Sequence, residues 1–172
     1  MMGRGHHTSI YKGMVTVEKP NKAAIPGTSD FLERMQKSFS RQKVMTTLGA
    51  TLNHVSPGRV EIAMPFHEAL TQQHGFLHAG IITTIVDSAC GYAAYTLMPP
   101  DASVLTVEYH VNFLSPAQGT RFLARGTVIK AGRTLTVCNG EVLAWIGSEE
   151  KLIATMSATM MTLTGRPHIS PG

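Results

Sequence analysis

Apolar and polar positions follow two different periods along this chain, and the change between them falls near residue 100. From about residue 78 to 97, apolar side chains occupy nearly every face of a helix, which Pro99-Pro100 ends. Turn-forming residues in SPAQG, KAGRT and IGSEEK then separate segments that alternate with the period of two typical of strands, at about 103–114, 120–130, 134–146 and 150–163. The pattern therefore predicts a buried helix followed by four antiparallel strands.

Two more elements are predicted ahead of the buried helix. Asp30 and Glu33 have the spacing of a capping box with an acidic N-cap, and the apolar residues that follow predict a helix from about 30 to 47. The segment ATLNHVSPGRVEIAMPF then alternates around Pro57-Gly58, which predicts a hairpin of two short strands. One buried helix and about six antiparallel strands indicate an α+β domain in which a sheet wraps around a long central α-helix.

The chain has 172 residues, which suits one domain with a single core. Residues 1–27 contain Gly, Pro and Lys without a clear period, and we expect them to form a flexible N-terminal tail. The domain is expected to occupy residues 28–165, with its N-terminal helix at about 30–47, and residues 166–172 are expected to form a C-terminal tail.

Composition argues against several classes of protein. A hydrophobic content of 43% and a charged content of 15% do not suit a disordered chain. No apolar run reaches the roughly 18 uncharged residues that a membrane-spanning helix needs. The N-terminus lacks the apolar segment of a secretory signal, so cytoplasmic residence is expected. Its first acidic residue is Glu18, which leaves an organelle-targeting sequence open as an alternative.

The formal net charge of +4 favours an anionic partner without identifying it. Cationic residues recur along the predicted helix at 30–47 without a recognition motif, so a solvated helix face is a better interpretation than a nucleic-acid patch. Cys90 and Cys138 lie in apolar surroundings and lack metal-ligand spacing. We therefore expect reduced, buried thiols and no metal site.

Asp87 interrupts the apolar central helix, where an ionised carboxylate costs several kcal/mol unless something pairs with it. The surrounding HGFLHAGIITTIVDSACGYAA and the order of elements resemble the hotdog-fold acyl-CoA thioesterases of the phenylacetate-pathway (PaaI-like) type, over roughly residues 45–163. The family's His-Gly-Gly motif and following acidic residue correspond to His78-Ala79-Gly80 and Asp87, and NFLSPAQG and KAGRTL are similar to its later strands. Ala79 departs from the motif glycine but keeps the backbone N–H.

The resemblance implies an enzyme that hydrolyses an acyl- or aryl-CoA thioester to the free acid and coenzyme A. Coenzyme A is part of the substrate, so no separate cofactor is expected. The reaction needs a carboxylate, here Asp87, as nucleophile or general base, and donors for the developing oxyanion. The N–H groups of Ala79 and Gly80 at the helix N-terminus are the expected donors. The competing interpretations are that Gly80 only permits close packing and that Asp87 has a structural partner.

The spacing of these groups predicts how subunits assemble. Asp87 follows Ala79 by eight residues, which on an α-helix is about 12 Å along the axis. One substrate carbonyl cannot meet both, because its carbon must approach the nucleophile to about 3 to 3.5 Å while its oxygen touches the donors. We therefore expect antiparallel helices from two subunits, in a homodimer with shared active sites, as the resembling family is built. A dimer of dimers is also expected, because hotdog sheets often associate.

The resemblance gives three more residues a role near the carboxylate. Gln72, fifteen residues before Asp87, corresponds to an amide that positions the attacking water or the carboxylate, with Gln73 as the alternative. His78 is expected to hold the loop before the helix through hydrogen bonds, and Thr106 to place a hydroxyl near Asp87. A solvent-facing loop amide and an ordinary β-branched strand residue are the competing interpretations of Gln72 and Thr106.

The segment KAGRT contains the expected binding residues for coenzyme A. Lys130 and Arg133 flank its glycine turn, where cations suit the phosphates of coenzyme A, and Arg133 matches the family's basic position. An ordinary charged hairpin turn is the alternative. An apolar acyl pocket is expected to draw on Ile82, Tyr92, Leu97 or Phe113. The acyl group itself stays open between aryl, short-chain and medium-chain.

Two other functions compete with hydrolysis. Hotdog dehydratases and hydratases pair an acid with a catalytic histidine in family-specific loops, and no histidine lies four or five residues after Asp87. A non-catalytic acyl-CoA sensor combines the domain with a DNA-binding module, for which a single helix at 30–47 is too little. The acidic residue in the motif favours catalysis over such a sensor.

Overall fold

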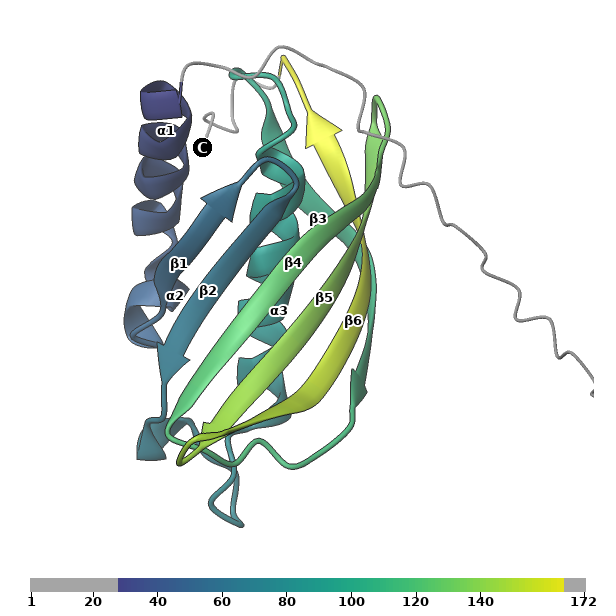
Figure 1. The fold of residues 1–172 in the computed structure, drawn as a ribbon. Coiled ribbons are helices and arrows are strands. Elements are labelled where there is room, and N and C mark those ends of the chain that lie inside the picture. Colours follow the sequence, from purple (N-terminus) through teal and green to yellow (C-terminus); the bar gives the residue numbers. More distant parts are fainter. Residues whose placement is uncertain (1–27, 166–172) are drawn as a thin grey trace, which may run out of the picture.

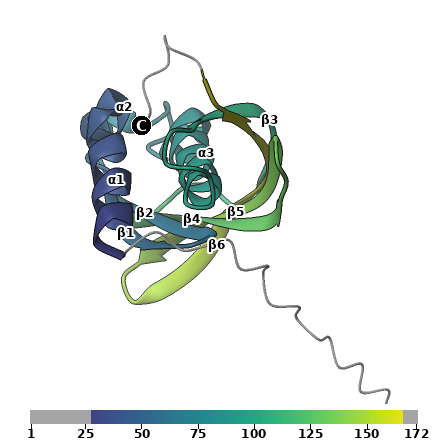
Figure 2. The same ribbon diagram turned by 90° about the horizontal axis from the view of Figure 1, so that it is seen from above.

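In this structure, a computed structural model, residues 28–165 are described, and the tails expected at 1–27 and 166–172 lie outside the described residues. A six-stranded sheet curls around one long helix, and two shorter helices lie along one side (Figure 1 and Figure 2). The elements follow in the order α1 (Thr28–Arg41), α2 (Lys43–Thr47), β1 (Thr51–Ser56), β2 (Arg59–Pro65), η1 (Glu68–Leu70), α3 (Ala79–Tyr95), β3 (Ser103–Phe113), β4 (Arg121–Ala131), β5 (Leu135–Ile146) and β6 (Glu149–Leu163).

The strands lie in the order β1-β2-β4-β5-β6-β3, and every neighbouring pair is antiparallel. After α3 the chain therefore passes to the far edge of the sheet, where β3 pairs with β6. The turn predicted at Pro57-Gly58 joins β1 and β2, and Gly58 has a φ of +77°, which favours glycine. The predicted α+β class is confirmed, with an antiparallel sheet wrapped around a long central helix in the hotdog arrangement.

A pair of glycines allows α3 to lie directly on the sheet. Gly126 of β4 is paired with Gly140 of β5. A Cβ atom on Gly126 would come within 2.3 Å of the Ala89 backbone, and one on Gly140 would come within 2.5 Å of the Val86 side chain. Because neither residue carries a side chain, the helix approaches the sheet closely, and Val86, Ala89 and Cys90 are fully buried. No helix among residues 28–165, α3 included, is long and apolar enough to cross a membrane.

The single helix predicted at 30–47 is divided into α1 and α2, so that prediction was wrong in detail. α1 begins at Thr28, ahead of Asp30, and Asp30 is therefore not its N-cap. The chain leaves the helical conformation at Gln42, which has a ψ of 93°. The Ser88 hydroxyl of α3 donates to Gln42 Oε1 over 3.4 Å. The break at Gln42 thus coincides with a contact to α3. The spacing of apolar residues along α1 and α2 does not predict this break.

Arg34 joins α1 to the end of α3. Its guanidinium donates to the backbone oxygen of Pro99 over 3.0 Å and to that of Tyr95 over 3.2 Å. The same group lies 4.6 Å from the centre of the Tyr95 ring. The last carbonyl groups of a helix have no partner within it, and a cation is favoured at that end. Arg34 therefore stabilises the position of α1 against α3.

The edge strand β3 is only partly covered. Tyr109 and Phe113 are each 48% exposed, although they pair with buried Ala158 and Ala154 on the inner face of β6. Strands β2, β4, β5 and β6 bury that face against α3. The inner side of β3 in a single chain therefore presents apolar side chains to solvent.

Glu61 on the outer face of β2 is buried beneath two arginines. Its Oε1 accepts from Arg59 over 2.8 Å and from Arg125 over 2.9 Å, and Asn53 donates to its Oε2 over 3.3 Å. Arg125 also pairs with Glu141 over 3.3 Å. Burial raises the pKa of Glu61, but the hydrogen bonds from the arginines outweigh it and hold the pKa below the usual value of 4.5.

Candidate functional site

Asp87 lies in the middle of α3 and shares a hydrogen bond with the edge strand. The hydroxyl of Thr106 on β3 donates to Asp87 Oδ1 over 2.8 Å. Burial raises the pKa of the Asp87 carboxyl above its usual value of 3.8, and the Thr106 hydrogen bond opposes this rise. The carboxylate is half-buried, and its protonation state is governed by these two opposing effects.

Asp87 lines two hollows. A cavity of about 390 Å³ extends between α1, α3 and β3, and it is called the α1 cavity below. A second hollow of about 370 Å³ runs along α3 from Asp87 to Gly80, past Thr83 and Thr84, and is bounded by Tyr109 of β3. Asp87 can therefore be reached by a ligand from either hollow.

The N-terminus of α3 is capped by His78. Its Nδ1 accepts the Gly80 N–H over 2.9 Å, and its backbone oxygen accepts the Ile81 N–H over 2.9 Å. A Cβ on Gly80 would lie 3.2 Å from this Nδ1, so glycine leaves room for the imidazole. Ala79 is the first residue of the helix, and its N–H has no carbonyl partner within the helix. The Ala79 N–H is thus the better oxyanion donor, because the Gly80 N–H already has an acceptor.

The two candidate amides, Gln72 and Gln73, have different environments in the loop before α3. Gln72 is half-buried, and its Oε1 accepts the His74 N–H over 2.6 Å. It lines a hollow of about 270 Å³ together with Ala79, Ile82 and others. Gln73 is exposed and lies 3.4 Å from the His74 ring. The geometry therefore places Gln72, and not Gln73, beside the helix N-terminus, and places Ile82 there as well.

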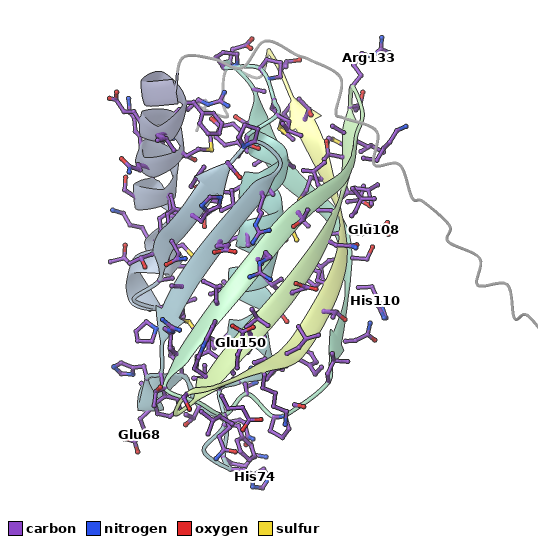
Figure 3. All side chains as sticks on the ribbon, viewed as in Figure 1. Glu68, His74, Glu108, His110, Arg133 and Glu150 are labelled. Carbon is purple, nitrogen blue, oxygen red and sulfur yellow. The ribbon has the colours of Figure 1, made fainter. Side chains whose placement is uncertain are left out.

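The residues expected to bind coenzyme A lie at the other end of the molecule. Arg133 lines a cavity of about 700 Å³ between the β4–β5 turn and the C-terminal end of α3, where Leu97 and Met98 contribute. Figure 3 shows Arg133 and His74 at opposite ends of the domain. Lys130 is exposed on β4 and does not line this cavity. One chain therefore does not bring Arg133 to the N-terminus of its own α3.

The structure sorts the predicted site residues into three groups within one chain. Asp87 and Thr106 are in contact, Ala79, Gln72 and Ile82 line one hollow, and Arg133 lies apart. Both cysteines are free and buried, as expected, and burial raises the pKa of Cys138 to about 12. Residues 28–165 contain no group of three or more His, Cys, Asp or Glu arranged to hold a metal.

The contribution of α1 to this site was not anticipated from the sequence. Ser38, Arg41 and Gln42 line the α1 cavity next to Asp87. In the single helix predicted at 30–47, their spacing of three and four residues places them on one face, and this is the signal that could have identified them. The helix was interpreted through its apolar residues and its surface charge, which left this polar stripe without a role.

Comparisons with known proteins agree with this fold. The family model described as Thioesterase superfamily matches residues 74–147. A thioesterase family protein from Silicibacter pomeroyi is 57% identical, with a TM-score of 0.78 over 78% of this chain and 99% of that one. Acyl-coenzyme A thioesterase 13 from Homo sapiens is 28% identical over 62% of this chain and 74% of its own. The E. coli PaaI protein, at 16% identity and a TM-score of 0.71 over 80% of this chain and 96% of its own, has a similar fold.

Proposed function

The chain belongs to the thioesterase superfamily and is a thioester hydrolase, and we propose that it hydrolyses acyl-CoA to the free acid and coenzyme A at a site shared between two subunits. In this site Asp87 of one protomer faces the Ala79 N–H of its partner. The observation that carries the proposal is the half-buried Asp87 carboxylate, which receives the Thr106 hydrogen bond and opens onto two hollows.

The distance within one α3 supports the second subunit. Asp87 and Ala79 lie about 12 Å apart along the helix. Across this distance one thioester cannot place its carbonyl carbon at Asp87 and its carbonyl oxygen at the Ala79 N–H of the same chain. An antiparallel copy of α3 brings the two groups together twice, once at each site. The half-exposed Tyr109 and Phe113 on the β3 edge supply an apolar surface for that copy to cover.

The proposed chemistry uses the ionised form of Asp87. As a general base, the carboxylate takes a proton from water while the water oxygen attacks the thioester carbon; as a nucleophile, it attacks that carbon itself and water then hydrolyses the anhydride. In both routes the Ala79 N–H stabilises the negative charge on the carbonyl oxygen. The sulfur of coenzyme A leaves as a thiolate and takes up the proton that the attacking water gives up. Gln72 lines the hollow beside Ala79 and is assigned to position the attacking group.

The remaining assignments concern structure and substrate. His78 holds the N-terminus of α3 through its bond to Gly80, and Gly80 is a second oxyanion donor only when that bond opens.

Arg133 is assigned to the phosphates of coenzyme A, since its cavity is large and cationic, with exposed Lys130 as an auxiliary cation. Ile82 contributes to the apolar wall near Ala79. A further pairing of dimers through the outer sheet faces completes the proposed assembly.

The test is release of free thiol from a panel of acyl-CoAs by the native protein, by Asp87→Asn and by Asp101→Asn. Asp87→Asn keeps the side-chain shape but removes the charge, so kcat/KM should fall by at least about a hundredfold. Asp101 is exposed and lines none of the hollows around Asp87, so its variant should match the native protein. Binding of acyl-CoA without turnover by the native protein, or full activity in Asp87→Asn, would contradict the proposal.

Thermal unfolding of the same variants separates chemistry from folding. Because burial raises the pKa of Asp87 in the folded state, the ionised carboxylate lowers native-state stability at neutral pH, and protonation at lower pH relieves this. Asp87→Asn removes the charge permanently, so its Tm at pH 7 should equal or exceed that of the native protein. A loss of activity together with a lower Tm would instead indicate a structural role for the carboxylate.

A further inference from the structure

The α1 cavity has a polarity that the hydrolytic chemistry does not require. Among the residues of the described range 28–165 that line it, Asp87 is the single anion and Arg41 of α1 is the single cation. The lining also includes the hydroxyl groups of Ser38 and Tyr92 and the amide of Gln42. Pockets for alkyl chains are lined mainly by apolar side chains, whereas a few placed polar groups orient a polar ligand. The polar lining of the α1 cavity therefore suits a ligand with a polar group.

The polar groups of this cavity act mainly as donors. Ser38 Oγ and Tyr92 OH lie 3.1 Å apart, so one hydroxyl hydrogen is used between them and the other is available. Gln42 Oε1 accepts from Ser88, which leaves the Gln42 NH₂ group as a donor. Burial raises the pKa of Tyr92, while the Ser38 hydrogen bond and the positive charge of Arg41 lower it, so the guanidinium is within electrostatic reach of the phenol.

The position of these donors along α3 relates them to the reaction. Tyr92 follows Asp87 by five residues, which is about 7.5 Å along the helix axis. Asp87 lines both the α1 cavity and the hollow that leads to the helix N-terminus. A thioester carbon held at Asp87 can thus extend its acyl chain into the α1 cavity, toward Arg41, Tyr92 and Ser38.

We propose that the α1 cavity receives the acyl group and selects one that ends in a carboxylate, with Arg41, Tyr92 and Ser38 as the residues that recognise this carboxylate. The substrate class is then a short ω-carboxyacyl-CoA, and this inference rests on the proposed acyl-CoA hydrolase function. Charge also sets the orientation of the substrate. The distal carboxylate is attracted to Arg41 and repelled by Asp87, so the neutral thioester is the end that lies at the catalytic carboxylate.

The experiment measures kcat/KM for three acyl-CoAs of similar length whose distal groups differ: adipoyl-CoA, 6-hydroxyhexanoyl-CoA and heptanoyl-CoA. The native protein, Arg41→Gln and Lys37→Gln are compared. Lys37 is a matched control, because it is an exposed cation of α1 that does not line the cavity. Ratios between substrates within one variant cancel any general loss of activity or of attraction to coenzyme A. Tyr92→Phe, which removes only the hydroxyl, serves as a second variant.

The native protein should prefer adipoyl-CoA to heptanoyl-CoA by at least about tenfold, which is the effect of hydrogen bonds to a charged group. Arg41→Gln should bring this ratio to about one while heptanoyl-CoA hydrolysis stays within about threefold of native. Lys37→Gln should leave the ratio unchanged, and Tyr92→Phe should lower it.

Two kinds of result would overturn the inference, and they are distinguishable. Hydrolysis with no preference for adipoyl-CoA, with a preference for the hydroxyl or methyl end, or with a ratio unchanged in Arg41→Gln would leave the hydrolase function standing and refute the carboxylate site. No hydrolysis of any of the three thioesters by the native protein would refute the hydrolase function itself, and the inference with it.

Discussion

At Asp87, burial and a single hydroxyl act on one carboxyl pKa in opposite directions. Burial raises the pKa, and the 2.8 Å hydrogen bond from Thr106 lowers it by stabilising the ionised form. A base or nucleophile needs both effects, because the carboxylate must be ionised at working pH and still basic enough to react. The balance therefore depends on the residue at position 106.

The substitution Thr106→Val removes the hydroxyl and keeps the branched shape. Without this hydrogen bond the pKa of Asp87 should rise further, so the acidic limb of the pH–kcat/KM profile should move to higher pH. Activity at neutral pH should fall by about tenfold, the typical effect of losing one hydrogen bond to a charged group. Thr155→Val on β6, at a position without a contact to Asp87, is the control. A limb that stays in place, or that moves to lower pH, would contradict this account of Asp87.

Among the elements, α3 shows what hydrophobic periodicity can and cannot reveal. The central helix and strands β3 to β6 were predicted close to their observed bounds. For α3 and strands β4 to β6, burial against the same chain determines the pattern. The break at Gln42 and the pairing of Gly126 with Gly140 were not predicted, since both depend on which distant segment lies alongside. The His78 bond that occupies the Gly80 N–H was missed for a different reason, because this local contact depends on the orientation of the His78 side chain.

The contact of α3 with the sheet predicts a sharp difference between two glycine substitutions. In Gly126→Ala the new Cβ would meet the Ala89 backbone at 2.3 Å, so the helix must shift, and we expect the free energy of unfolding to fall by about 3 kcal/mol or more. Gly91→Ala on α3 has nothing within 4 Å of its Cβ. It should stabilise the helix by about 0.5 to 1 kcal/mol. Denaturant unfolding of both variants measures this, and equal effects would refute the close approach.

For the whole molecule, the β3 edge explains why the site could be predicted only in part. Thr106 and Tyr109 lie on the inner side of a strand whose sequence alternates as if buried, yet both are exposed in one chain. The alternation along β3 indicates that one face of the strand is buried, but it does not show which surface covers that face. In the proposed account that surface is a second copy, whose α3 also supplies the oxyanion donor.

The ion pairs of Glu61 make the stability of the whole domain sensitive to acid. The folded-state pKa of Glu61 lies below 4.5, so its contribution is fully present above the unfolded pKa and is lost as pH falls through the folded pKa. Glu61→Gln should lower the free energy of unfolding at pH 7 by about 1 to 2 kcal/mol. The difference from the native protein should shrink below about pH 4.5. A difference that is constant with pH would show that the carboxylate charge has no such role.

The most direct test of the shared site combines two inactive variants. Ala79→Pro removes the donor N–H at the first position of α3, where proline is tolerated, and the extended ψ of 138° at His78 suits a following proline. Asp87→Asn removes the carboxylate. Each variant alone should lose at least about a hundredfold in kcat/KM. Co-expressed in equal amounts, they should recover about a quarter of native activity, because half of the dimers are mixed and one of their two sites is intact. Activity of the mixture no higher than that of its components would contradict a site built from Asp87 of one subunit and Ala79 of the other.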